Sequence, residues 1–233
     1  MLPAGVHPSH WLSRFGEAGI VLPVALALAL WWIVATRSAR PASAWLAPLG
    51  VAVLITTASK VAFIGWGIGS ATLDFTGFSG HAMFAAVIYP MLAQALTAHW
   101  REAGRRRDAL LALGAAYAFA ALIAVSRVRV GAHSVSEAAA GFGLGALASA
   151  SALWLAGHAR QRLPALWAGL GLAAWFGVMP IQAAPSQTHG MVTRLALELS
   201  GHELPFRRED LHRAAGSWRP ALSGAAIAAD PQR

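Results

Sequence analysis

Six apolar stretches account for most of the first three quarters of the chain. They cover residues 18–36, 43–63, 82–98, 109–125, 135–156 and 163–181. A helix needs about 17 to 25 mostly apolar residues to cross a hydrocarbon core of roughly 30 Å, and all six stretches meet that length. The pattern therefore predicts an all-α, polytopic membrane helix bundle with about six transmembrane helices over residues 1–181. A polar C-terminal tail, residues 182–233, follows the last stretch.

The loops between these stretches differ in charge, and the difference predicts their orientation. The loops after the first, third and fifth stretches carry Arg37, Arg40, Arg101, Arg105, Arg106, Arg107, Arg160 and Arg162. Arginine-rich loops stay in the cytoplasm, so the other loops, the N-terminus and the tail are predicted to face outward. The tail contains a short amphipathic stretch, "MVTRLALELSG", of a kind that can lie on a membrane surface.

Composition supports a membrane protein and argues against other classes. The chain has 233 residues, of which 57% are hydrophobic and 12% charged, and its mean hydropathy is +0.53. The formal net charge of +8 would suggest nucleic acid as the partner of a soluble protein. Here the arginines lie mostly in loops between apolar stretches, so we expect membrane lipids and no nucleic acid as partners. The absence of cysteine excludes disulfides and cysteine metal sites.

Polar residues gather at the predicted outer end of the bundle, where two loops meet. One group is Lys60, Asp74, Ser79 and His81; the other is Arg127, Arg129, His133 and Glu137. Ionisable groups near a hydrocarbon core are costly, so their convergence from two loops indicates a functional site. We interpret Asp74 and Arg129 as loop residues, the first capping its loop and the second contacting loop or headgroup.

The spacing of His133 and Glu137 indicates a reactive histidine. If the fifth predicted helix begins near His133, the two residues share a face, and the carboxylate can accept a proton from one ring nitrogen. The other nitrogen is then free and nucleophilic. The face continues with Gly141, Gly145 and Ser149, which predicts close packing against another helix. A buried His-Glu pair that only ties helices together is the alternative interpretation.

Other members of the group are suited to hold an anion. Arg127 can bind a phosphate through two parallel hydrogen bonds from its planar guanidinium. Lys60, the single lysine of the chain, can bind it through the positive charge of its ammonium group. Ser79 and Gly80 precede His81 at the start of the third predicted helix, where free N–H groups favour an anion. His81 beside that anion can donate a proton to a departing oxygen. Snorkelling side chains and an N-capping serine are the alternatives for these residues.

These residues resemble the three motifs of the type 2 phosphatidic acid phosphatase superfamily: Lys-x6-Arg-Pro, Pro-Ser-Gly-His and Ser-Arg-x5-His-x3-Asp. The third appears here as Ser126, Arg127, His133 and Glu137, the second as Phe78, Ser79, Gly80 and His81, and the first as Lys60 alone. Three positions depart from the motifs. Glu137 replaces aspartate, Phe78 replaces proline, and the Arg-Pro pair falls on Gly67 and Ile68. The loss of that arginine removes one side chain that would bind the phosphate, and it leaves the substrate class open.

The resemblance implies a metal-independent, cofactor-free lipid phosphatase in which His133 attacks phosphorus, Glu137 orients it and His81 protonates the leaving alcohol. The phosphate ligands would be Lys60, Ser79, Gly80 and Arg127. The expected substrate is a lipid phosphate, either a phosphomonoester or a diphosphate, hydrolysed at the periplasmic face of a bacterial inner membrane. A non-catalytic or transport bundle with a phosphate-binding site is the alternative. Related vanadate-dependent haloperoxidases share the motifs but are expected to be soluble, against which the six apolar stretches argue.

Overall fold

The computed structural model describes residues 8–156, 165–182, 187–214 and 216. Within these ranges the chain forms ten helices and no strand beyond one isolated bridge between Ser70 and Phe75. The helices are α1 (Pro8–Arg14), α2 (Ala18–Thr36), α3 (Arg40–Trp66), α4 (Gly80–Leu96), α5 (Ala98–Glu102), α6 (Arg106–Arg129), α7 (Val135–Ala156), α8 (Ala165–Gln182), α9 (Thr188–Ser200) and α10 (Arg208–Ala214). Within the described residues all six predicted stretches are helical apart from Thr97, which separates α4 from α5, so the all-α bundle is confirmed.

The helices have the length and composition of membrane spans. Among those described, four are long and apolar enough to cross: Pro8–Val34, which joins α1 to α2, then α3, α6 and α7. The helices α4 and α8 are apolar and shorter. Large apolar side chains such as Leu26, Leu54 and Leu147 are exposed on the outside of the bundle, where lipid replaces water. The chain is therefore a membrane protein.

Two spans are longer than the apolar pattern predicts. The arginines at both ends of α6 extend it beyond 109–125, and α3 similarly continues to Trp66. Long basic side chains can reach the interface from a helix end, so a helix can continue past its apolar part. The helix α3 then stops at Gly67, whose φ of 69° is the left-handed conformation that glycine adopts readily.

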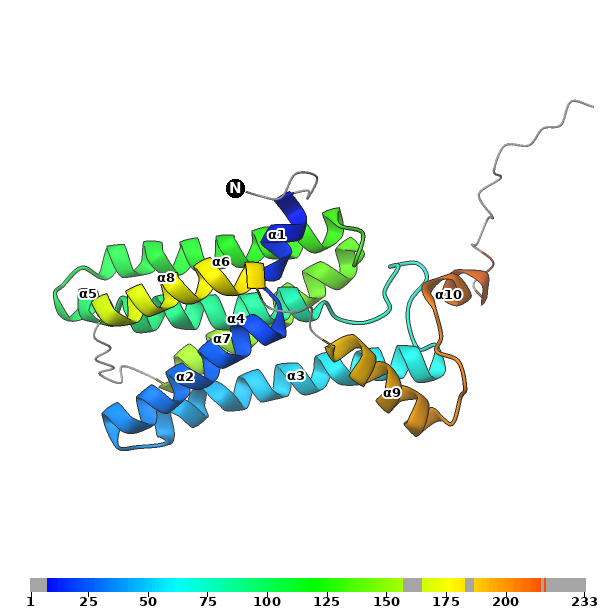
Figure 1. Ribbon diagram of the computed structural model, residues 1–233, viewed down its shortest axis with the longest axis horizontal. Coiled ribbons are helices and arrows are strands. Elements are labelled where there is room, and N and C mark those ends of the chain that lie inside the picture. Colours follow the sequence, from blue (N-terminus) through cyan, green and yellow to red (C-terminus); the bar gives the residue numbers. More distant parts are fainter. Residues whose placement is uncertain (1–7, 157–164, 183–186, 215, 217–233) are drawn as a thin grey trace, which may run out of the picture.

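The helix α4 lies at the centre of the bundle and packs on α6, α7 and α2 (Figure 1). Its contact with α7 is made through the predicted small-residue face. A Cβ on Gly141 would lie 2.5 Å from the carbonyl oxygen of Ser79, and one on Gly145 would collide with the carbonyl of Met83. The Ser149 hydroxyl donates to the Ala86 carbonyl, 2.9 Å away. The predicted close packing is confirmed, and it brings the start of α4 against the start of α7.

The tail folds back onto the bundle. Helix α9 runs beside the C-terminal part of α3, where Ala196 is fully buried against Val61 and Ile64 (Figure 1). The amphipathic stretch therefore uses one face for contact with α3, while Met191 and Leu199 on its other face are exposed. Helix α10 follows next to the loop between α3 and α4, so this described part of the tail lies beside the predicted site.

Candidate active site

A short turn between α6 and α7 places His133 next to Glu137. In this turn Gly131 has a φ of 70°, and Ser134 and Glu137 then form a capping box. The Ser134 hydroxyl accepts a hydrogen bond from the Glu137 N–H, 3.3 Å away, and the Glu137 carboxylate accepts one from the Ser134 N–H, 3.2 Å away. This box fixes the carboxylate at the start of α7. His133 Nδ1 lies 2.7 Å from Glu137 Oε2, so the predicted hydrogen bond is present.

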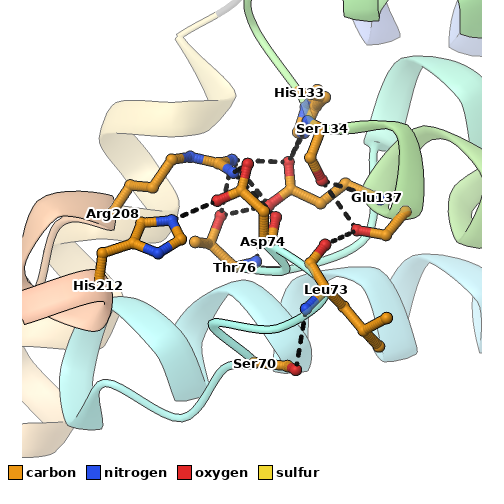
Figure 2. A network of polar contacts seen from close by, with 10 residues as sticks. Ser70, Leu73, Asp74, Thr76, His133, Ser134, Glu137, Arg208 and His212 are labelled. Atoms are coloured by element: carbon orange, nitrogen blue, oxygen red, sulfur yellow. Dashed lines mark hydrogen bonds and ion pairs between the residues drawn. The ribbon is translucent and has the colours of Figure 1, made fainter. Parts of the chain in front are cut away.

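The Glu137 carboxylate is fully buried and receives hydrogen bonds on both oxygens (Figure 2). Oε1 accepts from the Thr76 N–H at 2.7 Å and from the Thr76 hydroxyl at 2.5 Å. Arg208 Nη2 donates to both oxygens at 2.9 Å. All these partners are donors, which favours the charged carboxylate. Nδ1 of His133 must then carry the proton that this carboxylate accepts, and Nε2 is left with its lone pair.

The electrostatic setting of His133 keeps the ring neutral. Burial lowers the pKa of His133, whereas the hydrogen bond to Glu137 raises it, and nearby Lys60 and Arg127 lower it further. The net result is a pKa below the usual value for histidine. At neutral pH His133 is therefore a neutral imidazole, the form that can act as a nucleophile.

Most of the remaining predicted residues line a cavity beside His133, which has a volume of about 1080 Å³. Its lining includes Lys60, Gly80, His81, Arg127 and His133. A Cβ on Gly80 would lie 3.9 Å from the Lys60 ammonium, at an ordinary contact distance, so Gly80 and Lys60 are neighbours in the cavity wall.

Ser79 is buried at the first turn of α4, where its N–H donates to the Glu137 carbonyl at 3.1 Å. Ser79 occupies the N-cap position of α4, as the alternative interpretation expects, but its hydroxyl makes no capping hydrogen bond. Within the described part of the chain, the Ser79 hydroxyl and Arg127 Nε are buried polar atoms without a hydrogen-bond partner. Both groups can donate a hydrogen bond to a phosphate oxygen.

Sequence reasoning missed the contribution of the N-terminal helix. Arg127 donates from Nη1 to the Ser13 hydroxyl, and Arg14 forms an ion pair with Glu17 at 2.8 Å. Ser13, Arg14 and Glu17 all line the cavity. The only signal for them was a basic and an acidic residue three positions apart before the first apolar stretch.

Sequence reasoning also missed the tail. Arg208 forms ion pairs with Asp74 at 2.6 Å and with Glu137 at 2.9 Å, and His212 lies 2.7 Å from Asp74 (Figure 2). Partial burial would raise the pKa of Asp74, but the hydrogen bonds from Arg208 and His212 bring it below the usual value. Asp74 is thus more than the loop residue expected from sequence, because it anchors two side chains of α10.

Comparison with known proteins agrees with this geometry. Residues 67–162 match the family model of the PAP2 superfamily. A Klebsiella pneumoniae protein described as "Uncharacterized 22.5 kDa protein in cps region" is 33% identical over 209 residues, which cover 88% of this chain and 97% of that protein. The chain belongs to the PAP2 superfamily. No solved structure matches it.

Membership of the PAP2 superfamily implies a phosphatase, a hydrolase of phosphate esters. The matched region contains His81, Arg127, His133 and Glu137, and it begins just after Lys60. Among the described residues no three histidine, aspartate or glutamate side chains are grouped as a metal site. The roles of the individual residues remain predictions that the geometry makes testable.

Proposed function

We propose that this PAP2 protein hydrolyses lipid phosphates at the outer face of a bacterial inner membrane through a phosphohistidine intermediate. The observation that carries the proposal is the His133-Glu137 pair at 2.7 Å, beside a cavity that Lys60 and Arg127 also line. In this pair Nδ1 is held by the carboxylate and Nε2 has its lone pair available. The unpartnered donors of Ser79 and Arg127 within the described structure support a phosphate next to that nitrogen.

The reaction then proceeds in two displacements at phosphorus. Nε2 of His133 attacks, the P–N bond forms, and the P–O bond to the lipid breaks with its electron pair going to the leaving oxygen. His81 gives that oxygen a proton. The phosphorylated ring is cationic, and Glu137 stabilises it. In the second step His81 takes a proton from water, the resulting hydroxide attacks phosphorus, and the P–N bond breaks to release phosphate and restore His133.

The lining of the cavity supports a lipid substrate. Its polar part is continued by apolar side chains from three spans, namely Leu22 of α2, Val53 of α3 and Phe84 of α4. Val53 lies about two turns of α3 from Lys60, on the way toward the middle of the span. A lipid phosphate would place its phosphate in the polar part of the cavity and its acyl or prenyl chain along the apolar part.

The charge of the loops supports the proposed orientation in the membrane, and a bacterial relative supports the proposed bacterial membrane. The arginine content of the loops predicts the cytoplasmic ends of the spans, and the site, which is at the opposite ends, would then be periplasmic. The loop that carries Arg160 and Arg162 lies outside the described residues. The Klebsiella relative supports a bacterial membrane.

Phosphate release by the purified, detergent-solubilised protein tests the proposal. The substrates are phosphatidate, phosphatidylglycerophosphate, a polyprenyl diphosphate and a water-soluble phosphate ester. We expect release from at least one lipid phosphate, none in His133→Ala, and wild-type release in the matched control His99→Ala, which changes an exposed histidine on α5. Binding of these lipids without any release would instead indicate a non-catalytic or transport protein.

A further inference from the structure

The C-terminal tail is attached to the rim of the active site by specific contacts. The Phe206 N–H donates to the Ile64 carbonyl at 2.9 Å, and His202 Nδ1 lies 2.7 Å from the Gly65 carbonyl. The Phe206 ring packs against Gly67, where a Cβ would lie only 3.0 Å from the ring. These contacts lie at the end of α3, and two residues further along the tail comes Arg208. The tail is thus held where Arg208 can reach into the site.

Arg208 bridges two carboxylates, Asp74 from the loop between α3 and α4 and Glu137 from the first turn of α7 (Figure 2). Nη1 contacts Asp74 at 2.6 Å through the carboxylate and at 2.9 Å through the carbonyl, and Nη2 contacts both oxygens of Glu137 at 2.9 Å. The guanidinium therefore approaches Glu137 beside the His133 contact, and it forms an ion pair with this fully buried carboxylate. A buried carboxylate without that cation would draw a proton onto its other close partner, the ring of His133.

We propose that Arg208 is a positioning residue of the phosphatase reaction, and that the C-terminal tail is thereby part of the active site. Arg208 acts through Glu137: it fixes the carboxylate that orients His133, and it balances the carboxylate's charge so that His133 stays a neutral nucleophile. The inference rests on the proposed function, since it assigns a role in the same reaction.

The charges around His133 decide whether removal of Arg208 raises or lowers the pKa of His133. The groups that face it are His81 on α4, Lys60 on α3, Arg127 on α6, Glu137 on α7 and, behind Glu137, Arg208 on α10. Glu137 raises the pKa of His133, whereas Lys60 and Arg127 lower it. Removal of Arg208 strengthens the pull of Glu137, so the pKa of His133 rises. A nucleophile that must be neutral is lost as pH falls through its pKa, so the acid limb of the rate profile moves to higher pH.

The test uses the full-length protein in detergent and compares Arg208→Gln, Arg208→Lys and Arg213→Gln. Arg213 is the matched control because it is an exposed arginine on the same helix, paired with Asp210 at 3.1 Å. For Arg208→Gln we expect the acid limb of kcat/KM to move up by about one pH unit or more, with about a tenfold loss of rate per unit below it. We expect kcat to fall and KM to change by less than about threefold.

Arg208→Lys keeps the positive charge but loses the planar guanidinium that contacts Asp74 and Glu137 together. We therefore expect a reduced kcat and an acid limb near that of the wild type. This variant also decides the question if Arg208→Gln proves unstable. Arg213→Gln should have the wild-type profile.

Several results would overturn the inference while leaving the proposed function intact. The first is an Arg208→Gln protein with the kcat and the pH profile of the wild type. The proposed function would still hold if, in the same experiment, the wild type is active and His133→Ala is inactive. A loss confined to KM would make Arg208 a substrate ligand, and an equal loss at every pH in both Arg208 variants would make its role purely structural. Failure of the proposed function looks different, because the wild type itself would then release no phosphate.

Discussion

Replacement of Glu137 by glutamine tests the centre of the site, because it preserves the size of the side chain and changes only charge and hydrogen bonding. Every partner of the carboxylate is a donor: Thr76 through two groups, His133, the Ser134 N–H and Arg208. A glutamine amide offers one oxygen and one NH₂ group. In either orientation of the amide, the NH₂ faces donors.

The cost to stability follows from that mismatch. One or two partly buried donors lose their acceptor, at about 1–3 kcal/mol each, which gives a loss of about 1–6 kcal/mol in the free energy of unfolding. This is a large part of the stability of a typical domain. We therefore expect Glu137→Gln to lower the midpoint of thermal unfolding clearly, whereas Glu198→Gln, on the exposed face of α9, should not.

The cost to activity has two sources. With the amide NH₂ toward His133, Nδ1 becomes the acceptor, the proton moves to Nε2, and the ring cannot attack phosphorus; a wrong tautomer costs up to about 10⁴-fold in kcat. With the amide oxygen toward His133, the tautomer is correct but the charge that stabilises the phosphorylated ring is lost, which costs on the order of 10²-fold. We expect a fall in kcat between these limits. Glu137→Asp restores the charge with a shorter arm and should retain more activity.

The assay is phosphate release from the best lipid substrate, with kcat and KM measured separately at a temperature where each variant remains folded. A Glu137→Gln protein that is stable and keeps kcat within about threefold of the wild type would refute the reasoning. That result would mean that the carboxylate neither sets the tautomer nor stabilises the intermediate.

Three further predictions follow from the same site. His81→Ala should lose most turnover of lipid phosphates but recover part of it on p-nitrophenyl phosphate, whose leaving group needs no proton, whereas His133→Ala should be inactive on both; equal losses on both substrates for the two variants would contradict the assigned roles. Phosphate release should survive EDTA and be inhibited by vanadate, and activity that disappears with EDTA and returns with magnesium would indicate a different mechanism. Reporter fusions at Gly104 should score as cytoplasmic and fusions at Gly131 as external, and the reverse result would exclude a periplasmic site.

The sequence was sufficient to predict the features that depend on local spacing. Apolar length located the four helices that are long enough to cross a membrane and the two shorter apolar helices α4 and α8. A separation of four residues located the His133-Glu137 hydrogen bond. The small residues Gly141 and Gly145 likewise identified the face of α7 that packs closely, because only glycine allows a backbone carbonyl to approach so near.

The features that the sequence did not reveal depend on how distant segments meet. Arg208 is 71 positions from Glu137 and lies in a polar segment with several other arginines, so nothing in its surroundings distinguishes it. Its contact with Glu137 exists because α9 binds along α3 and the tail then turns at Phe206. Asp74 could not be assigned for the same reason, since its partners belong to that tail. Tertiary contacts of this kind leave no periodic pattern in the chain.

The glycine contact between α4 and α7 has a consequence for how the enzyme responds to its membrane. Bilayers differ in thickness, and helices adapt by tilting or sliding. Between Gly141 and Ser79 the contact is backbone against backbone, and the Ser79 N–H is also bonded to the Glu137 carbonyl at 3.1 Å, so no side-chain rotamer can absorb a displacement. The turn that carries Ser79, Gly80 and His81 must therefore move together with the helix that carries Glu137. A thinner or thicker bilayer can therefore tilt other helices of the bundle while the spacing between the start of α4 and the start of α7 stays constant.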